Sequence, residues 1–364
     1  MGTSDEGALP SLKVLHVIAK SYPSLNGYTV RSHEMFKAQK KTGEIIPLAI
    51  TSPYYPEIRE MAEEAIIDGI EYRRTMPRRS RATMANWEGF SWFLRVIIYP
   101  LRMLKQFLME KSLMSEFEKR IEDIAKEEDP DILQAHTPFK VGLPTMRVAR
   151  KLRKPFIYEV RGLWEESAIA RGRFSKWNLR YWRFRFMETR TMRSADKVFC
   201  LSNTMRDQLI KRGVNKKDIA IIRNGAPADY LEDWAEKELG VDGNEDSSLQ
   251  TIKKTSESNS IIGYVGSIQE YEGLRDLMEA VGKMKSQQRK VHLLIVSNDE
   301  NKTYLDEVCR EMKIQGDVTL VGPIPRRKIR EYYEQKLHPD VLDLNDQEVY
   351  KNIFHDKKWI GIFQ

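Results

Sequence analysis

The sequence predicts an α/β protein with two doubly wound domains that face each other across a cleft, because a strand, a glycine turn and a helix follow one another twice. In residues 261–281 an apolar run reaches Gly266, a polar turn follows, and apolar residues at helical spacing begin near Gly273. Residues 12–38 repeat this pattern around Gly27. A chain of 364 residues is long for one domain, so each pattern is expected to open its own parallel sheet. Ligands of such sheets bind at the carboxyl ends of the strands, where both glycine turns lie.

The composition is that of an ordinary globular protein with room for two cores. The chain is 41% hydrophobic and carries a net charge of +7. With only Cys200 and Cys309, no disulfide framework is expected, which favours a reducing compartment. The first ten residues lack the basic start and apolar run of a signal peptide, and no uncharged apolar stretch reaches about 18 residues. These features predict a cytoplasmic protein without a transmembrane helix.

The first glycine turn is expected to lie at a ligand site. It spans residues 21–27, between a strand at 14–19 and a helix at 28–39, and the amides at the start of that helix could meet an anionic group. A plain turn between a strand and a helix would explain the same residues. Two further short strands are expected at residues 44–51 and 69–75, the second on a peripheral hairpin.

Two segments combine cations with aromatic rings. Residues 73–111 contain nine Lys or Arg against two Glu, and residues 174–186 contain no acid. Such segments can lie in an anionic membrane interface, or they can be helices that pack on the domain with a basic face outward. No recognised nucleic-acid motif accompanies them, so no nucleic acid partner is predicted. The candidate residues for membrane or acceptor binding are Trp92, Arg95, Arg102, Trp177 and Trp182.

Two neighbouring strands bring polar side chains to one sheet edge. After a charged helix at 117–128, the strand at 131–139 carries His136, and the strand at 155–164 carries Glu159 and Arg161. A histidine and an arginine at the ends of parallel strands can hold a phosphate or a sugar hydroxyl. For His136 alone, a structural histidine is the competing interpretation.

The remaining elements define the domain boundaries. A strand, a Ser202–Asn203 cap and a helix occupy 195–214, and a strand that ends at an Asn-Gly turn follows at 218–227. We assign residues 10–235 to the first domain, 236–259 to a polar linker, 260–335 to the second domain and 336–364 to a divergent tail. Within the second domain, strands at 291–297 and 317–324 alternate with helices at 303–314 and 326–335.

The order and spacing of these motifs resemble those of the family 4 (group 1) glycosyltransferases of the GT-B fold, over about residues 12–335. The motifs that carry the resemblance are SYPSLNGYTVRSHE, DILQAHTPFKVGLP, PFIYEVRGLWEES, ADKVFCLSNTM, IAIIRNGAP, IIGYVGSIQEYEGLRDLMEA and VTLVGPIPRRKIREYY. The resemblance implies two Rossmann-like domains, the first for the acceptor and the second for a nucleotide-sugar. It also implies transfer with retention of the anomeric configuration and without an essential metal. The nucleotide-sugar is then the donor substrate, and no cofactor or metal site is expected.

The same resemblance assigns roles to individual residues. It implies that Gly27 and Tyr28 lie beside the donor phosphates, that Arg161 lies near the reacting sugar, and that His136 lines the cleft. Arg161 and His136 are therefore the catalytic candidates, and we expect Arg161 to bind phosphate bidentately. On this basis Arg161→Ala would abolish transfer with little change in the thermal midpoint. The donor-binding candidates of the second domain are Gly266, Ser267 and Gly273.

Three departures from the family pattern concern the second domain. Ser267 and Glu272 occupy positions where many relatives have an arginine and a lysine that bind the diphosphate. No match to the acidic pair of the family is found in residues 336–364, so the second domain is interpreted as incomplete. The function expected is a retaining sugar transfer to a lipid-linked or polysaccharide acceptor in cell-surface glycan synthesis, peripheral at the inner face of the membrane. The alternative is a non-catalytic, truncated GT-B relative that binds an acceptor or a partner subunit.

Overall fold

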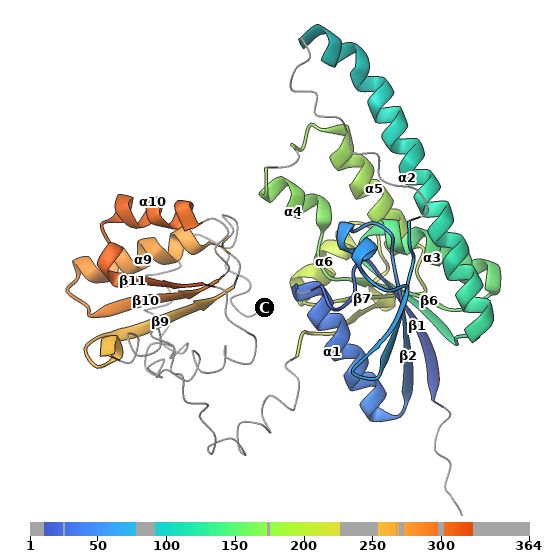
Figure 1. Cartoon of the computed structure of the whole chain (residues 1–364), viewed down its shortest axis with the longest axis horizontal. Coiled ribbons are helices and arrows are strands. Elements are labelled where there is room, and N and C mark those ends of the chain that lie inside the picture. The colour runs from blue at the N-terminus through green and yellow to red at the C-terminus, as the bar shows by residue number, and fades with distance from the viewer. Residues whose placement is uncertain are drawn as a thin grey trace, which may run out of the picture. The chain divides into compact units, whose positions relative to one another are not determined.

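A computed structural model of the chain describes residues 11–24, 26–77, 92–172, 175–225, 254–266, 268, 273–297 and 302–322 (Figure 1). For residues 56 and 92–104 only the backbone is described. The chain divides into two compact units, residues 1–232 and 233–364, which are taken in turn.

Unit 1 is built on an eight-stranded sheet in the order β3-β4-β2-β1-β5-β6-β7-β8. All neighbouring strands are parallel except β3 and β4, which form an antiparallel hairpin at one edge. The strands are β1 (Leu12–Ile18), β2 (Ile45–Thr51), β3 (Glu64–Ile67), β4 (Ile70–Arg74), β5 (Ile132–His136), β6 (Phe156–Val160), β7 (Lys197–Cys200) and β8 (Ile219–Ile221). The strands predicted from the sequence in this unit are confirmed.

Helices cover both faces of this sheet. They are α1 (Gly27–Thr42), α2 (Trp92–Glu128), α3 (Phe139–Leu152), α4 (Trp164–Ala170), α5 (Leu179–Arg193) and α6 (Asn203–Lys211), with short 3-10 turns η1 (Pro56–Glu60) and η2 (Lys216–Asp218). Successive strand residues point to opposite faces. Thus Leu15 and Val17 of β1 join the large core under α2, α3, α5 and α6, whereas Ile18 packs with Phe36 of α1 on the other face.

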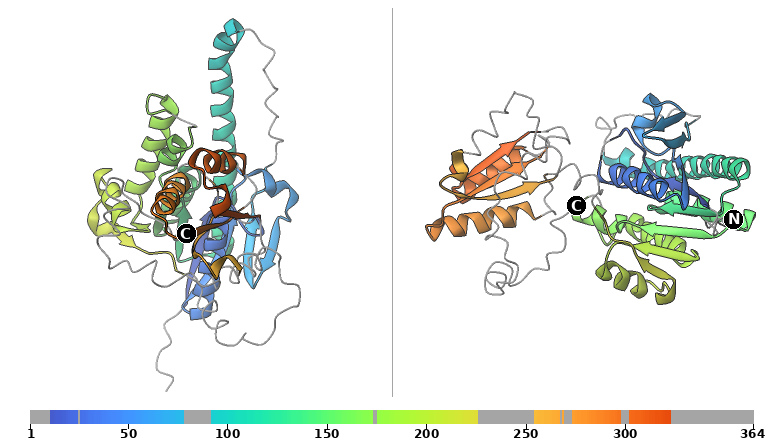
Figure 2. Two further views of the ribbon diagram at one scale, coloured as in Figure 1. Left: turned by 90° about the vertical axis from the view of Figure 1, so that its left-hand side faces the viewer. Right: turned by 90° about the horizontal axis from the view of Figure 1, so that it is seen from below.

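Helix α2 is one continuous helix of 37 residues, where the sequence analysis expected a basic aromatic segment and a separate helix at 117–128. Its last four turns are buried through Phe117, Ile121 and Ile124, whose spacing of three to four residues forms one apolar face. Its earlier part extends beyond the α/β body of unit 1 (Figures 1 and 2). The prediction of a separate helix at 117–128 is therefore wrong, because residues 117–128 are the end of the longer helix α2.

Unit 2 contains a parallel sheet in the order β11-β10-β9 within the described residues. Its elements are β9 (Ser260–Val265), α9 (Leu274–Ser286), β10 (Val291–Val296), α10 (Lys302–Met312), η4 (Gln315–Asp317) and β11 (Val318–Val321). The alternation of strands and helices confirms the α/β prediction for this part. The predicted helix at 326–335 and the tail at 336–364 lie outside the described residues.

Candidate functional site

The candidate site of unit 1 lies where the strand order of the sheet reverses. Strand β1 pairs with β2 on one side and with β5 on the other, and this switch point is where doubly wound sheets bind ligands. His16 of β1, Gln134 and His136 of β5 and Glu159 of β6 lie on the face that α1 covers, and Phe36 of α1 contacts both histidine rings. A polar layer is therefore buried beneath α1.

Glu159 is the centre of this layer. Its side chain is 2% exposed, and Oε1 accepts hydrogen bonds from Arg31 Nη2 at 2.7 Å and from Arg161 Nε at 3.2 Å. Oε2 accepts from Gln134 Nε2 at 3.1 Å. Burial alone would raise the pKa of Glu159, but Arg161, His136 and Arg31 outweigh it and hold the pKa well below its usual value. One ionised carboxylate thus holds two guanidinium groups.

Arg161 is buried in the same cluster and links it to α1. Its Nη1 donates to the Tyr28 carbonyl at 3.0 Å and to Ser32 Oγ at 2.7 Å, and Nη2 lies 2.9 Å from His136 Nδ1. The guanidinium also stacks over the Tyr28 ring. Because Nε and Nη1 of Arg161 already donate to protein oxygens, each edge of the guanidinium group is partly used, and the expected bidentate grip on a phosphate is not available in this arrangement. The side chain instead ties the start of α1 to the end of β6.

His136 is fully buried between His16 and Glu159. Its Nδ1 lies 2.7 Å from Glu159 Oε2, and its Nε2 lies 3.2 Å from His16 Nδ1. Because a carboxylate only accepts, we assign the proton to Nδ1, and this nitrogen then does not accept a hydrogen bond from the neighbouring Arg161 Nη2. Burial, together with Arg161, lowers the pKa of His136 to about 4, so the ring is neutral at pH 7. The structural interpretation of His136 fits this burial, whereas its direct contact with substrate stays a prediction.

The first glycine turn carries Gly27 and Tyr28 to the same place. Gly27 begins α1 and is exposed, and the Tyr28 hydroxyl accepts from the Ala19 amide at 2.9 Å. The side chain of Asn26 caps the helix and accepts from the amides of Tyr28 and Thr29. These two amides are therefore already satisfied within the protein, and contact of an anion with the start of α1 stays a prediction.

Arg74 of β4 holds this turn in place through hydrogen bonds. The sequence analysis assigned no role to Arg74. It is 1% exposed, and it donates to Ser21 Oγ at 3.1 Å, to the Tyr22 carbonyl at 2.8 Å and to the Ala62 carbonyl at 2.7 Å. A buried cation is stabilised by hydrogen bonds, and each of the three nitrogens of Arg74 donates one, two of them to the turn. The position of the glycine turn thus depends on β4.

A second buried carboxyl, Glu188 of α5, lies on the other face of the sheet. It accepts from the Phe139 amide and from the Tyr158 hydroxyl, both at 2.7 Å. Burial raises the pKa of Glu188 to about 7, and nearby Glu165 adds to the shift while Arg212 opposes it. The group joins the start of α3 to β6 and α5 and lies outside the candidate site.

We expect Glu188→Gln to stabilise unit 1 at high pH. Because the folded-state pKa of Glu188 exceeds its ordinary value, the native state binds more protons than the unfolded state between about pH 4.5 and 7, and stability falls as pH rises. Gln cannot ionise, so its advantage over wild type should grow from near zero at pH 4.5 to about 3 kcal/mol at pH 8. Urea unfolding at both pH values measures the gap. The control Glu118→Gln, on half-exposed Glu118, should stay within about 0.5 kcal/mol at both.

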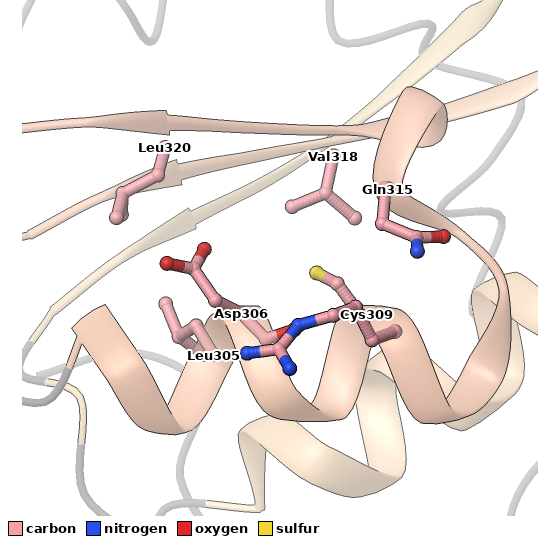
Figure 3. Close-up of a pocket in the computed structure, with 7 residues that line it drawn as sticks. Leu305, Asp306, Cys309, Gln315, Val318 and Leu320 are labelled. Carbon is pink, nitrogen blue, oxygen red and sulfur yellow. The ribbon is translucent and has the colours of Figure 1, made fainter.

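The predicted donor-binding residues of unit 2 lie at the end of β9 and the start of α9. The Gly266 amide donates to the Val296 carbonyl at 3.1 Å, and Gly273 caps α9 with a φ of +77°, a conformation that favours glycine. Ser267 lies outside the described residues. A separate hollow of about 410 Å³ lies between α10 and β11, lined by Leu305, Cys309 and Leu320 among others (Figure 3). It contains none of the predicted site residues.

The basic aromatic segment on α5 presents an apolar outer face. Leu179, Trp182 and Phe186 are 86%, 55% and 64% exposed at spacings of three and four residues, and Trp177 just before the helix is 94% exposed. The side chains of Trp92, Arg95 and Arg102 on α2 lie outside the described part of the structure. Among the residues described, no helix has the length and apolar character needed to cross a bilayer. In the same residues no group of three His, Cys, Asp or Glu side chains is arranged to bind a metal ion.

The sequence analysis missed Arg31, Ser32 and His16. Arg31 and Ser32 follow Tyr28 by three and four residues, so all three share one face of α1. This spacing could have predicted that Arg31 and Ser32 lie near the site with Tyr28. His16 is a polar residue inside an otherwise apolar strand, and it alternates with Leu15 and Val17. That pattern indicated a polar layer on one face of the sheet.

Comparison with known proteins agrees with this architecture. Residues 58–230 match the model of Glycosyltransferase Family 4, and residues 246–339 match that of Glycosyl transferases group 1, so the two cover about three quarters of the chain. The fold resembles that of a glycosyltransferase from Rickettsia africae ESF-5, with 16% identity, a TM-score of 0.54, and coverage of 88% of this chain and 70% of that one. It also resembles the catalytic domain of starch synthase IV from Arabidopsis thaliana, with 12% identity, a TM-score of 0.55, and coverage of 89% and 76%.

The chain is also similar to a curated relative, the alpha-monoglucosyldiacylglycerol synthase of Streptococcus pneumoniae (strain ATCC BAA-255 / R6). The two are 25% identical over 228 residues, which is 60% of this chain and 47% of the relative. The chain thus spans about half the length of that relative. With both family models matched in order, two parallel α/β sheets and a polar cluster at the switch point of the first, this chain belongs to the family 4 (group 1) glycosyltransferases and has the GT-B fold.

Proposed function

We propose that this chain transfers a sugar, with retention of configuration, from a nucleotide-sugar to a lipid-linked or polysaccharide acceptor. The observation that carries the proposal is the cluster around Glu159 at the switch point of unit 1, where two arginines meet one carboxylate. Sugar transfer from a nucleotide-sugar releases a diphosphate, so a cationic group is needed where negative charge develops. The two family models support the reaction class.

In the proposed reaction the donor supplies the base, and the protein residues position the substrates. The acceptor oxygen forms a bond to the anomeric carbon on the face from which the nucleoside diphosphate leaves, and a phosphate oxygen of that leaving group takes the proton of the acceptor hydroxyl. The protein then contributes positioning and charge stabilisation. Arg161 and His136 contribute by holding the cluster in place, and Gly27 lets a substrate approach the backbone at the start of α1. In unit 2 we assign donor binding to the turn that contains Gly266, Ser267 and Gly273.

The proposed acceptor side includes an anionic membrane surface at the inner face of the membrane. The exposed apolar face of α5 lies beside cations such as Lys176 and Arg180, a combination that suits rings at headgroup level and anionic lipid. Helix α5 also lies beside α2, since Arg183 of α5 donates to Glu110 of α2 (Figure 1). The similarity to an alpha-monoglucosyldiacylglycerol synthase of Streptococcus pneumoniae supports a lipid acceptor.

Thermal shift against UDP-, GDP- and ADP-sugars tests the donor. A ligand that binds only the native state stabilises it by about 2.7 kcal/mol at a hundredfold excess over Kd. One class of nucleotide-sugar should therefore raise the midpoint of thermal unfolding selectively. That donor then enters a transfer assay with lipid extract. Folded protein that shifts with none of them would contradict the donor proposal and favour the non-catalytic alternative.

Vesicle flotation tests the membrane surface. The double variant Trp177→Ser/Trp182→Ser should lose most of its binding to vesicles that contain phosphatidylglycerol, because two rings leave the interface. The matched control is Ile66→Ser, which removes an apolar side chain that is 76% exposed on β3. Equal flotation of both variants and wild type would remove α5 from the proposed surface.

A further inference from the structure

Helix α1 brings a second arginine to the cluster, and its contacts differ from those of Arg161. Arg31 donates from Nη2 to Glu159 Oε1 at 2.7 Å, and its side chain is 18% exposed against 7% for Arg161. The two guanidinium groups therefore share one carboxylate oxygen. Arg31 is the less enclosed of the two.

The remaining nitrogens of Arg31 are buried without a protein acceptor. Within the described ranges, Nε and Nη1 of Arg31 have no hydrogen-bond partner, whereas Nε and Nη1 of Arg161 both donate to protein oxygens. A buried guanidinium N–H without an acceptor is costly, so an acceptor from outside the described side chains is expected. Nε–H and Nη1–H point to different edges of the planar guanidinium group, so each can donate a separate hydrogen bond to an anionic oxygen.

The charge of the cluster selects an anion. Arg31 and Arg161 are both cationic, Glu159 is anionic, and His16 and His136 are neutral at pH 7 because burial lowers their pKa values. The cluster thus keeps one positive charge in a place that excludes most water. An anionic group neutralises that charge, whereas a neutral sugar does not.

We propose that Arg31 is the phosphate-binding residue of unit 1, held in place by Glu159, and that it takes a phosphate group of one of the two substrates. The proposal rests on the proposed function only for the identity of the substrate. The phosphate belongs either to the nucleotide-sugar or to a phosphate-linked lipid acceptor. In both cases Arg31 supplies in unit 1 a cation that Ser267 and Glu272 do not supply in unit 2.

Titration calorimetry of the full chain with inorganic diphosphate tests the site directly. Arg31→Gln should weaken binding at least tenfold, because it removes the positive charge and the charge-assisted hydrogen bonds that Arg31 can donate to the anion. Arg31→Lys keeps the charge but not the planar guanidinium group, and its affinity should lie between those of wild type and Arg31→Gln. The control Arg147→Gln breaks the exposed pair with Glu118 and should bind within twofold of wild type. Near-ultraviolet circular dichroism checks that each variant is folded.

Two further probes identify the source of the phosphate. If Arg31→Gln weakens the binding of a nucleoside diphosphate but not that of an isoprenyl phosphate, the donor supplies the group; the reverse result assigns it to the acceptor. Wild type that binds none of the three probes overturns the proposal, and so does Arg31→Gln that binds all of them like Arg147→Gln. Diphosphate binding that depends on Arg31, in a protein that transfers no sugar from any donor, would sustain this inference while contradicting the proposed function.

Discussion

Glu159→Ala is expected to lower the free energy of unfolding of unit 1 by about 3 to 5 kcal/mol, because it leaves two buried guanidinium groups without their shared carboxylate. Arg31 and Arg161 then repel each other at close range, and Gln134 and His136 each lose an acceptor. Urea unfolding at pH 7 measures the change. A loss of this size would remove a large fraction of the stability of an ordinary domain.

The control for this prediction is Glu118→Ala. Glu118 pairs with Arg147, but both side chains reach solvent, so the loss should not exceed about 1 kcal/mol. Glu159→Gln adds a second test. Its side chain has nearly the same shape, but its amide N–H group would face the N–H groups of Arg31, Arg161 and Gln134, which need an acceptor. If Glu159→Ala and Glu118→Ala lose the same small amount, the buried carboxylate does not hold the cluster together.

Arg161→Ala is expected to reduce transfer by about a hundredfold or more and to cost about 2 kcal/mol of stability. The activity falls because the start of α1, with Gly27 and Tyr28, is no longer tied to the end of β6. The stability falls because Arg161 is buried and bonded on several sides. This prediction differs from the expectation from the sequence that the thermal midpoint would hardly change, because the Arg161 side chain is only 7% exposed.

Steady-state kinetics and a thermal melt, run on the same preparations, separate the two effects. Arg161→Lys keeps the charge but cannot reach Ser32 and the Tyr28 carbonyl together, so it should recover stability before it recovers transfer. Arg147→Ala should match wild type in both assays. Full transfer by Arg161→Ala would remove this residue from the proposed site.

The backbone architecture could largely be predicted from the sequence, and the chemistry of the cluster only in part. The apolar runs around His16, His136 and Glu159 predicted parallel strands, because a buried strand is short, apolar and bounded by turn residues. The strand ends also placed Arg161 and His136 together at one edge. These predictions rested on local patterns of apolar and turn residues, which can be recognised along the sequence alone.

Contacts between segments that are distant in the sequence could not be predicted from such local patterns. Arg31 and Glu159 are 128 residues apart, and only the packing of α1 on the sheet makes them partners. The length of α2 was misjudged for a similar reason, because tertiary contacts at Phe117 and Ile121 support a helix whose first half has a different composition. Whether Arg161 faces a ligand or the protein also depends on Ser32 and Tyr28 on another element. No local pattern around residue 161 carries that information.

The place of β1 in the middle of the sheet has a consequence for how the chain folds. Strand β2 follows β1 closely, but β5, its other neighbour, begins more than a hundred residues later. At about 5 to 20 residues per second, a ribosome needs roughly 6 to 20 s to supply it. During that time β1 presents an unpaired apolar edge, which can pair with other nascent chains. Slow translation between Thr51 and Ile132, or a shortage of chaperones, should therefore lower the yield of native protein through aggregation of amino-terminal fragments.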